Sequence, residues 1–290
     1  MKTAFTMDDL PLWPQSYPPD GYTAQGIVRA IQDGLAQHGI SGVYAFANSW
    51  AIDKHPEFAD ILDDWVAAGH HIANHTHAHQ QLPDINAAAF IADIAEGERK
   101  LARWLNKAPR KLFRHPLCHW GETATKLAAV NAYLADIGAT PVDVTSWCYE
   151  WTWNRAYRAA RDAGDRKAEI YVKDSFLTFS LAQLMFDQAA AKAWFGQDIT
   201  AITLGHNVPF FADVAADYFG RLIDAGVMFV ALEDALVAPV QSAVGSVVSD
   251  KFLVLQQKLA DAAGRPTPQI VPECQEMFAR IKAMAGDLTV

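Results

Sequence analysis

Short runs of apolar and β-branched residues alternate along this chain with longer amphipathic segments of helical periodicity. A strand followed by a helix and then by another strand is the repeating unit of parallel α/β folds. The 290 residues are enough for one large domain or two ordinary ones. The pattern predicts strands at 3–7, 42–47, 71–73, 111–113, 141–145, 199–204 and 227–231, and helices at 23–38, 56–68, 86–105, 121–137 and 213–225.

Polar residues with useful chemistry stand at or just after the ends of these predicted strands. Asp8 and Asp9 follow the first strand, and His75, Arg114 and His206 follow later ones. The carboxyl ends of parallel strands meet at one edge, where functional loops gather. A barrel brings such ends into one ring, so we expect a distorted (β/α) barrel with about seven parallel strands rather than a doubly wound sheet.

Two stretches fall outside the simple alternation. Residues 148–198 are long, aromatic and helical in pattern, and we interpret them as an insertion. Residues 240–290 contain two further helical segments separated by Gly264-Arg265-Pro266. The predicted organisation is therefore a barrel domain at 1–239 that contains the insertion, with a helical C-terminal extension at 240–290 packed on it.

Composition excludes some classes of function. Lys and Arg total 24 against 33 Asp and Glu, which gives a net charge of -9, and no basic cluster is present. A nucleic-acid partner is therefore not expected. No apolar run approaches the roughly 20 residues that a membrane-spanning helix needs.

Cysteine usage and the start of the chain bear on localisation. Cys118, Cys148 and Cys274 are widely spaced, and at least one of the three must be unpaired within the chain. This favours a reducing compartment. The first residues run directly into a predicted strand, so we expect a cytoplasmic protein, or a periplasmic or secreted one if a leader peptide precedes this sequence.

The adjacent carboxylates of Asp8 and Asp9 and the spaced imidazoles of His75 and His79 suggest a metal site. Neighbouring carboxylates repel each other unless a cation lies beside them, and two histidines four residues apart are a common ligand spacing for a divalent metal. Taken singly, each pair is also compatible with an ordinary turn or a polar loop. Together they predict a mononuclear site with one carboxylate left over for proton transfer.

Four short motifs occur in a particular order. They read Thr-Met-Asp-Asp-Leu at 6–10, His-Thr-His-Ala-His at 75–79, Arg-His-Pro-Leu-Cys at 114–118 and Leu-Gly-His at 204–206. The series resembles the polysaccharide deacetylase family, also called the NodB homology domain or carbohydrate esterase family 4. The family's corresponding motifs are T-F-D-D-G, H-[S/T]-x-x-H, R-x-P-x-G and a leucine and histidine at a strand end. The resemblance covers roughly residues 3 to 236.

The resemblance implies a metal centre and a base. Asp9, His75 and His79 would bind a divalent metal, usually Zn²⁺, with positions left open for water and a substrate carbonyl. Asp8 would be the general base that takes a proton from the water. Arg114 would orient Asp8 and keep it ionised.

The remaining implied roles concern the oxyanion and the leaving group. The backbone N–H of Leu117 would stabilise the oxyanion, and His206 would be the general acid that protonates the departing amine. In the family an aspartate tunes this histidine. Here the candidates are Asp143, four residues before Trp147, and Glu150, which precedes Trp151. We slightly favour Asp143.

The sequence also departs from the family pattern. Leu10 and Cys118 stand where the family has glycine, which predicts a reshaped mouth of the pocket. The aromatic residues from 147 to 157 could stack on sugar rings, although core packing is the more ordinary role for any one of them.

These observations support three functional hypotheses. The first is a metal-dependent hydrolase, a carbohydrate deacetylase that removes an N-acetyl group from an amino sugar. The alternative on the same site is a deformylase or another hydrolase of small amides. A non-catalytic carbohydrate-binding protein is the third. The partner is thus a carbohydrate or a small amide substrate, and the sugar, the acyl group, the native metal and the oligomeric state are left open.

Overall fold

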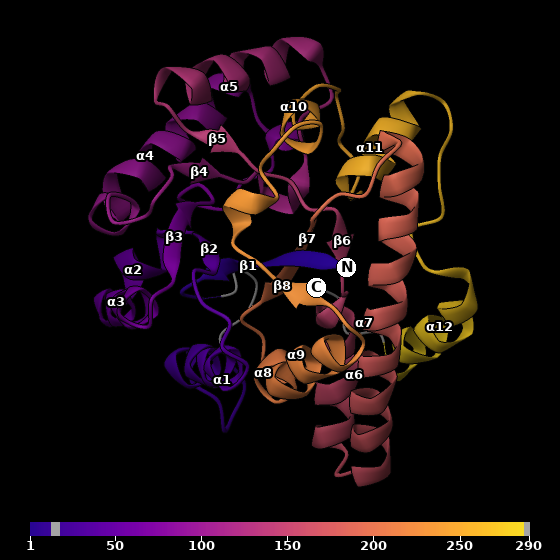
Figure 1. Ribbon diagram of the computed structural model, residues 1–290. Coiled ribbons are helices and arrows are strands. Elements are labelled where there is room, and N and C mark those ends of the chain that lie inside the picture. The colour runs from indigo at the N-terminus through magenta and orange to yellow at the C-terminus, as the bar shows by residue number, and fades with distance from the viewer. Residues whose placement is uncertain (13–17, 287–290) are drawn as a thin grey trace.

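A parallel sheet forms the centre of the molecule. The computed structural model describes residues 1–12 and 18–286 (Figure 1). The main path of the sheet runs β5-β4-β3-β2-β1-β7-β6, and β8 pairs with the first residues of β1. The strands are β1 (Lys2–Leu10), β2 (Tyr44–Ala47), β3 (His71–Asn74), β4 (Leu112–Phe113), β5 (Thr140–Pro141), β6 (Ser146–Trp147), β7 (Ala201–His206) and β8 (Met228–Phe229).

The sheet curls into a half-barrel, so the predicted distorted (β/α) barrel is confirmed. The predicted strand at 141–145 is wrong: residues 142–145 form no strand and instead connect β5 to β6, which lie at opposite ends of the main path. Only residues 142–145 separate these two edge strands, and an extended residue spans at most about 3.5 Å. The two ends of the sheet must therefore approach each other, which a flat sheet would not allow.

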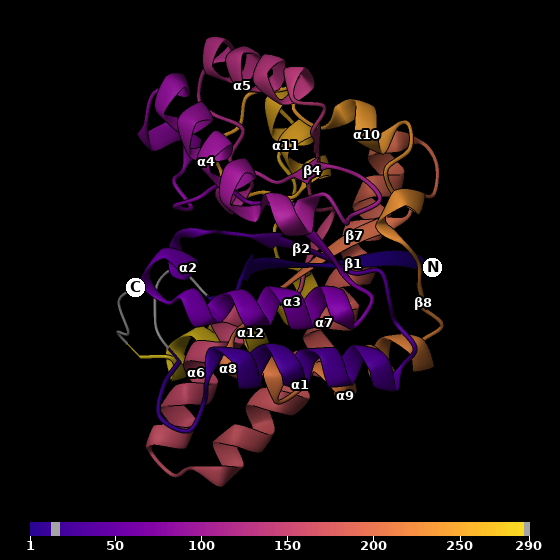
Figure 2. The ribbon, with the colours of Figure 1, turned by 90° about the vertical axis from the view of Figure 1, so that its left-hand side faces the viewer.

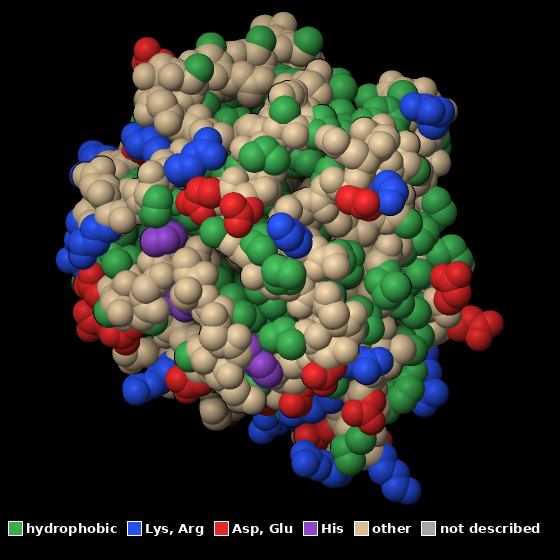
Figure 3. Space-filling model, in the orientation of Figure 1, with side chains coloured by type: hydrophobic (Ala, Val, Ile, Leu, Met, Phe, Trp, Pro, Cys, Tyr) green, Lys and Arg blue, Asp and Glu red, His purple; other side chains and the backbone are tan. Residues whose placement is uncertain are grey.

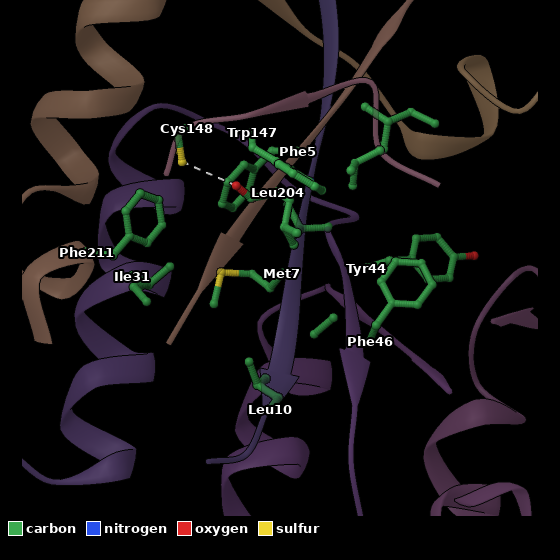
Figure 4. Close-up of a cluster of buried hydrophobic side chains, with 14 of the residues drawn as sticks. Phe5, Met7, Leu10, Ile31, Tyr44, Phe46, Trp147, Cys148, Leu204 and Phe211 are labelled. Atoms are coloured by element: carbon green, nitrogen blue, oxygen red, sulfur yellow. Dashed lines mark hydrogen bonds between the residues drawn. The ribbon is translucent and has the colours of Figure 1, made fainter. Parts of the chain in front are cut away.

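The central strand β1 is buried along nearly its whole length. Every residue after Lys2 is buried, as expected for a strand that lies between two parallel neighbours and is covered by helices. Phe5, Met7 and Leu10 pack with side chains of the neighbouring strands and helices in the main core (Figure 4). The hydroxyl of Thr6 is buried too, but it donates to the carbonyl of Thr203 at 2.7 Å and so remains satisfied.

Helices surround the sheet. Figures 1 and 2 show α1, α3 and α9 on one side and α4 and α5 on the other. On the face seen in Figure 3, side chains of both charge signs are interspersed without a continuous basic patch. The helices are α1 (Ala24–Gln37), α2 (Trp50–Lys54), α3 (Ala59–Ala67), α4 (Ala87–Leu105), α5 (Ala124–Asp136), α6 (Glu150–Asp162), α7 (Arg166–Phe195), α8 (Pro209–Ala212), α9 (Ala215–Asp224), α10 (Val240–Ala243), α11 (Leu255–Ala262) and α12 (Gln275–Met284).

Helices α6 and α7 occupy the stretch interpreted as an insertion, and α11 and α12 follow in the C-terminal extension. Trp153, Phe176 and Phe179 of the insertion are fully buried, and Phe278 of α12 packs against two of them, Trp153 and Phe179. Figure 1 shows α11 and α12 beside the long helix α7. Among the residues that the structure describes, no helix combines the length and the apolar character needed to cross a bilayer.

A buried ion pair ties the extension to the barrel. Lys258 of α11 donates to Asp143 at 2.5 Å, and neither side chain has more than 1% of its surface exposed. The ammonium group also lies 4.3 Å from the ring centroid of Trp120. A charge in this environment is tolerated only with its partner.

Lys258→Met is therefore expected to destabilise the fold by about 3–5 kcal/mol, because it leaves the Asp143 carboxylate buried and unpaired. The matched control is the double variant Asp143→Asn with Lys258→Met, which removes both charges and should recover most of the loss. Urea unfolding of the three proteins measures the difference. Equal stability of the wild type and the single variant would contradict this role for the pair.

Candidate active site

The two adjacent aspartates reach the same side of the sheet because of an irregularity in β1. Alternating side chains of a regular strand point to opposite faces. Here Asp8 pairs with Phe46 and Leu10 with Ala47, so Asp9 is an extra residue in a bulge. Its φ of 67° lies in the left-handed region. A bulge re-aims a side chain, and both carboxylates come within 3.8 Å of His75 Nε2.

The loop after β3 presents the two histidines. His75 is 1% exposed, and its Nδ1 lies 2.8 Å from the carbonyl oxygen of Arg114. A carbonyl can only accept, so the proton is on Nδ1 and the lone pair of Nε2 is directed to the aspartates. His79 is held by a hydrogen bond from its backbone N–H to the hydroxyl of Thr76, at 3.0 Å.

Helix α4 supports this loop at close range through a glycine. A Cβ atom on Gly97 would lie 2.7 Å from the side-chain oxygen of Asn74 and 3.0 Å from the backbone of Thr76. Asn74 in turn accepts from the N–H of Thr76 at 2.7 Å. Any larger residue at position 97 would thus push the helix away from the loop that presents the histidines.

Asp9, His75 and His79 are arranged as a metal site would require. Their ligand atoms all lie within 4.8 Å of one another. Asp9 Oδ1 is 3.3 Å from His79 Nε2 and 3.8 Å from His75 Nε2. Ligands at about 2.0–2.2 Å from a tetrahedral zinc ion are separated by about 3.3–3.6 Å. Asp9 Oδ1 is also buried without a hydrogen-bond donor among the described residues, so the donor set fits a divalent cation.

The electrostatics of this cluster favour a cation as well. Burial lowers the pKa of His75 to about 3 and that of His79 to about 4, so both imidazoles are neutral at physiological pH. Burial also raises the pKa of Asp9 to about 6, although the attraction of His75 opposes this shift. Neutral imidazoles and a desolvated carboxylate are the forms that bind zinc.

Asp8 differs from Asp9 in its partner. Arg114, which follows β4, is fully buried and donates from Nη1 to Asp8 Oδ1 at 2.7 Å and to the hydroxyl of Thr6 at 3.0 Å. Its guanidinium also stacks on the ring of Phe46, 3.9 Å from the centroid. These charge-assisted hydrogen bonds fix the orientation of the Asp8 carboxylate.

His206 is brought to this site by strand register. It pairs directly with Asp8 across the β1–β7 ladder. Glu150 Oε1 accepts from the backbone N–H of His206 at 2.8 Å and lies 2.5 Å from its Nδ1. Burial lowers the pKa of His206, but the attraction of Glu150 outweighs it, and the net shift is upward. This histidine is therefore suited to carry a proton near neutral pH.

The predicted partner of this histidine needs correction. The sequence slightly favours Asp143, but that carboxylate is bound to Lys258 in the core. Glu150, at the start of α6, contacts His206 instead. Spacing along the chain could not separate the two, because the choice depends on Lys258, 115 residues further along.

Leu10 and Cys118 stand at positions where the family has glycine, which predicts a reshaped pocket mouth. Both side chains are buried, so neither is exposed at a pocket mouth. Leu10 is fully buried in the core (Figure 4), and the left-handed φ belongs to Asp9. Cys118 is buried with a left-handed φ of 55°, directly after Leu117 at 51°. Leu117 is only partly buried, and residues with such strained backbone angles are typical of functional loops.

The chain is similar to a known protein family and to several solved structures. Residues 2–135 match the family model described as polysaccharide deacetylase. A CE4 family pseudoenzyme from Bacillus anthracis is 13% identical with a TM-score of 0.53, over 81% of this chain and 66% of that chain. The family 4 carbohydrate esterase from Streptomyces lividans is 17% identical with a TM-score of 0.50, over 78% and 90%. A peptidoglycan N-acetylglucosamine deacetylase is 18% identical with a TM-score of 0.52, over 81% and 87%.

The resemblance found in the motifs is thus confirmed, because residues 2–135, which contain the first three motifs, match the family model. No protein with a curated function matches the chain by sequence. The fold is shared by esterases, deacetylases and a pseudoenzyme, and a mutant of that pseudoenzyme has restored activity. The fold alone therefore does not show whether this chain is catalytic, and the residues of the site decide it.

The electrostatics of Asp9 lead to a prediction for the metal-free protein. Because its pKa is raised from 3.8 to about 6, the folded state loses stability as the pH rises through this interval. Above pH 6 the penalty amounts to roughly 3 kcal/mol, at about 1.4 kcal/mol for each pKa unit. Asp9→Asn is therefore expected to stabilise the metal-free protein at pH 8.

Added zinc is expected to raise the melting temperature of this variant much less than that of the wild type, because one of the three candidate ligands is missing. Thermal unfolding at pH 8 with and without zinc checks both effects. A metal-free Asp9→Asn protein that melts below the metal-free wild type would contradict the prediction.

Proposed function

We propose that this protein is a metal-dependent amide hydrolase that removes an N-acetyl group from an amino sugar. The observation that carries the proposal is the convergence of Asp9, His75 and His79 within 4.8 Å, while neighbouring Asp8 is bound to Arg114. The fold agrees with this, because similar solved structures include a carbohydrate esterase and an N-acetylglucosamine deacetylase.

The chain supplies a group for each part of amide hydrolysis. Asp9, His75 and His79 would hold the divalent metal, and zinc suits this donor set best. A bound zinc ion would polarise the scissile carbonyl and acidify a water molecule. Asp8, held in place by its ion pair with Arg114, would take the proton from the attacking water.

The proton for the leaving group would come from the other side of the site. His206 pairs with Asp8 in strand register, and Glu150 favours its protonated form. It would donate to the amine nitrogen as the carbon–nitrogen bond breaks, which a poor leaving group requires. The backbone N–H of Leu117 would stabilise the oxyanion.

Metal dependence and acetate release test the proposal. The protein loaded with zinc is expected to release acetate from N-acetylglucosamine oligomers, and chelation should lower the rate by about 100-fold or more, with recovery on readdition of zinc. The same assay with N-formylglucosamine and with small N-formyl amides tests the deformylase alternative. Full activity in a sample shown to be metal-free would refute the proposal, and binding of the oligomers without turnover would favour a carbohydrate-binding protein.

A further inference from the structure

A continuous line of aromatic side chains leads from the C-terminal extension to His206. The ring of Phe252 lies flat on Trp147, with centroids 3.8 Å apart and an interplanar angle of 25°. It meets Trp151 edge-on at 5.5 Å, and Trp151 meets His206 edge-on at 5.3 Å. Trp147 is 1% exposed, whereas Trp151 and Phe252 are only partly buried. These two residues are therefore the members of the line that keep some exposed surface.

The position of Phe252 is fixed by backbone contacts on both sides of it. The N–H of Trp120 donates to the carbonyl of Ser249 at 2.7 Å, and the N–H of Leu255 donates to the carbonyl of Val144 at 2.8 Å. Trp120 and Val144 lie in loops that follow strands of the barrel, and α11, which begins at Leu255, lies beside α7 (Figure 1). The ring is thus held in place before any ligand arrives, which reduces the entropy lost on binding.

The chemistry of the site indicates what would meet these rings. His206 gives its proton to the amine nitrogen, so the group that carries this amine must lie on the His206 side of the scissile bond. Trp151 is in contact with His206, and Phe252 is the next side chain in the line. The acyl group, by contrast, lies on the far side of the carbonyl carbon. Flat aromatic faces suit the apolar face of a sugar ring, which is bound by stacking.

We propose that Phe252, together with Trp151, is a specificity-determining residue that selects a ring-bearing amine, such as an amino sugar, as the leaving group. This inference rests on the proposed function, since it takes His206 as the proton donor. It assigns to the C-terminal extension, which lies outside the matched family domain at residues 2–135, a part in forming the site. A chain without Phe252 would keep its hydrolytic groups and lose its preference for the sugar.

The test compares two substrates with the same acetyl group and different amines. The zinc-loaded wild type, Phe252→Ala and Phe252→Tyr are assayed with the N-acetylglucosamine tetramer and with N-acetylethanolamine. We expect Phe252→Ala to raise KM for the tetramer about five- to tenfold, with kcat and the rate on N-acetylethanolamine unchanged. Phe252→Tyr should restore the wild-type KM. Val248→Ala, an exposed position in the same extension, is the matched control and should change neither substrate.

Binding without turnover separates this inference from the proposed function. The tetramer is titrated calorimetrically into Asp8→Asn with and without Phe252→Ala, and a five- to tenfold weaker affinity in the double variant is expected. Unchanged affinity and KM would overturn the inference while leaving amide hydrolysis intact. An equal loss on both substrates would also overturn it, since it would assign Phe252 a purely structural role. If neither substrate is hydrolysed, the proposed function fails, and the binding comparison alone decides the role of Phe252.

Discussion

Asp8→Asn is expected to lower kcat about 10²- to 10⁴-fold while zinc remains bound at one ion per chain. The asparagine side chain has nearly the same shape but cannot accept a proton from water at neutral pH. Asp9, His75 and His79 are unchanged, and they are the residues whose ligand atoms gather within 4.8 Å. Steady-state rates with N-acetylglucosamine oligomers, together with metal analysis of the same sample, measure the two effects.

The control for this experiment must account for Arg114. This guanidinium is fully buried, and two of its nitrogen atoms, Nε and Nη2, have no hydrogen-bond partner among the described residues. Loss of the Asp8 charge leaves it unpaired, so the variant is expected to be less stable by a few kcal/mol. Assays should therefore be run well below the melting temperature of Asp8→Asn. His75→Ala gives the contrasting result, because it should lose zinc and activity together.

A variant of Asp8 that keeps more than a tenth of the wild-type kcat would remove this carboxylate from the role of base. Loss of zinc in Asp8→Asn would instead mean that Asp8 contributes to metal binding, so that the roles of ligand and base are wrongly assigned to the two aspartates. The bulge at Asp9 gives the two aspartates different partners. Asp9 Oδ1 faces both imidazoles, whereas Asp8 Oδ1 is occupied by Arg114.

The sequence predicted most of the strands and the metal cluster, because both depend on local patterns, although residues 142–145 form no strand. Buried parallel strands are short apolar runs, and a histidine pair four residues apart is visible in the chain. The motif order then placed Asp8, Arg114 and His206 at the same sheet edge, where the register pairs Asp8 with His206.

Other features could not be predicted, because they depend on contacts between distant segments. Glu150 pairs with His206 while Asp143 binds Lys258, and neither pairing has a signature in sequence spacing. The contact of Phe252 with Trp147 likewise depends on how the extension folds back on the barrel. The bulge that turns Asp9 is a backbone feature, and a non-glycine residue with left-handed φ is not expected from composition.

Glu150→Gln is expected to lower kcat about 10- to 100-fold at neutral pH and to move the alkaline limb of the pH–rate profile to lower pH. The Glu150 carboxylate is fully buried, and its attraction raises the pKa of His206 against the effect of burial. A group with a raised pKa keeps its proton to higher pH, so His206 remains a competent acid there. The neutral amide removes that attraction, the pKa falls, and the acid is lost at lower pH.

Two control variants test whether the shift of the alkaline limb comes from the loss of the Glu150 charge. Glu150→Asp retains the charge at a greater distance, so its alkaline limb should lie between those of the wild type and Glu150→Gln. Cys148 donates its thiol hydrogen to Glu150 Oε2 at 3.1 Å, and Cys148→Ser should preserve both this contact and the profile. A uniform drop in kcat at every pH, with the limb unmoved, would mean that Glu150 only positions the imidazole. Since the amide can still accept a hydrogen bond from His206, the position of the limb, rather than the size of the drop, separates a charge effect from a steric one.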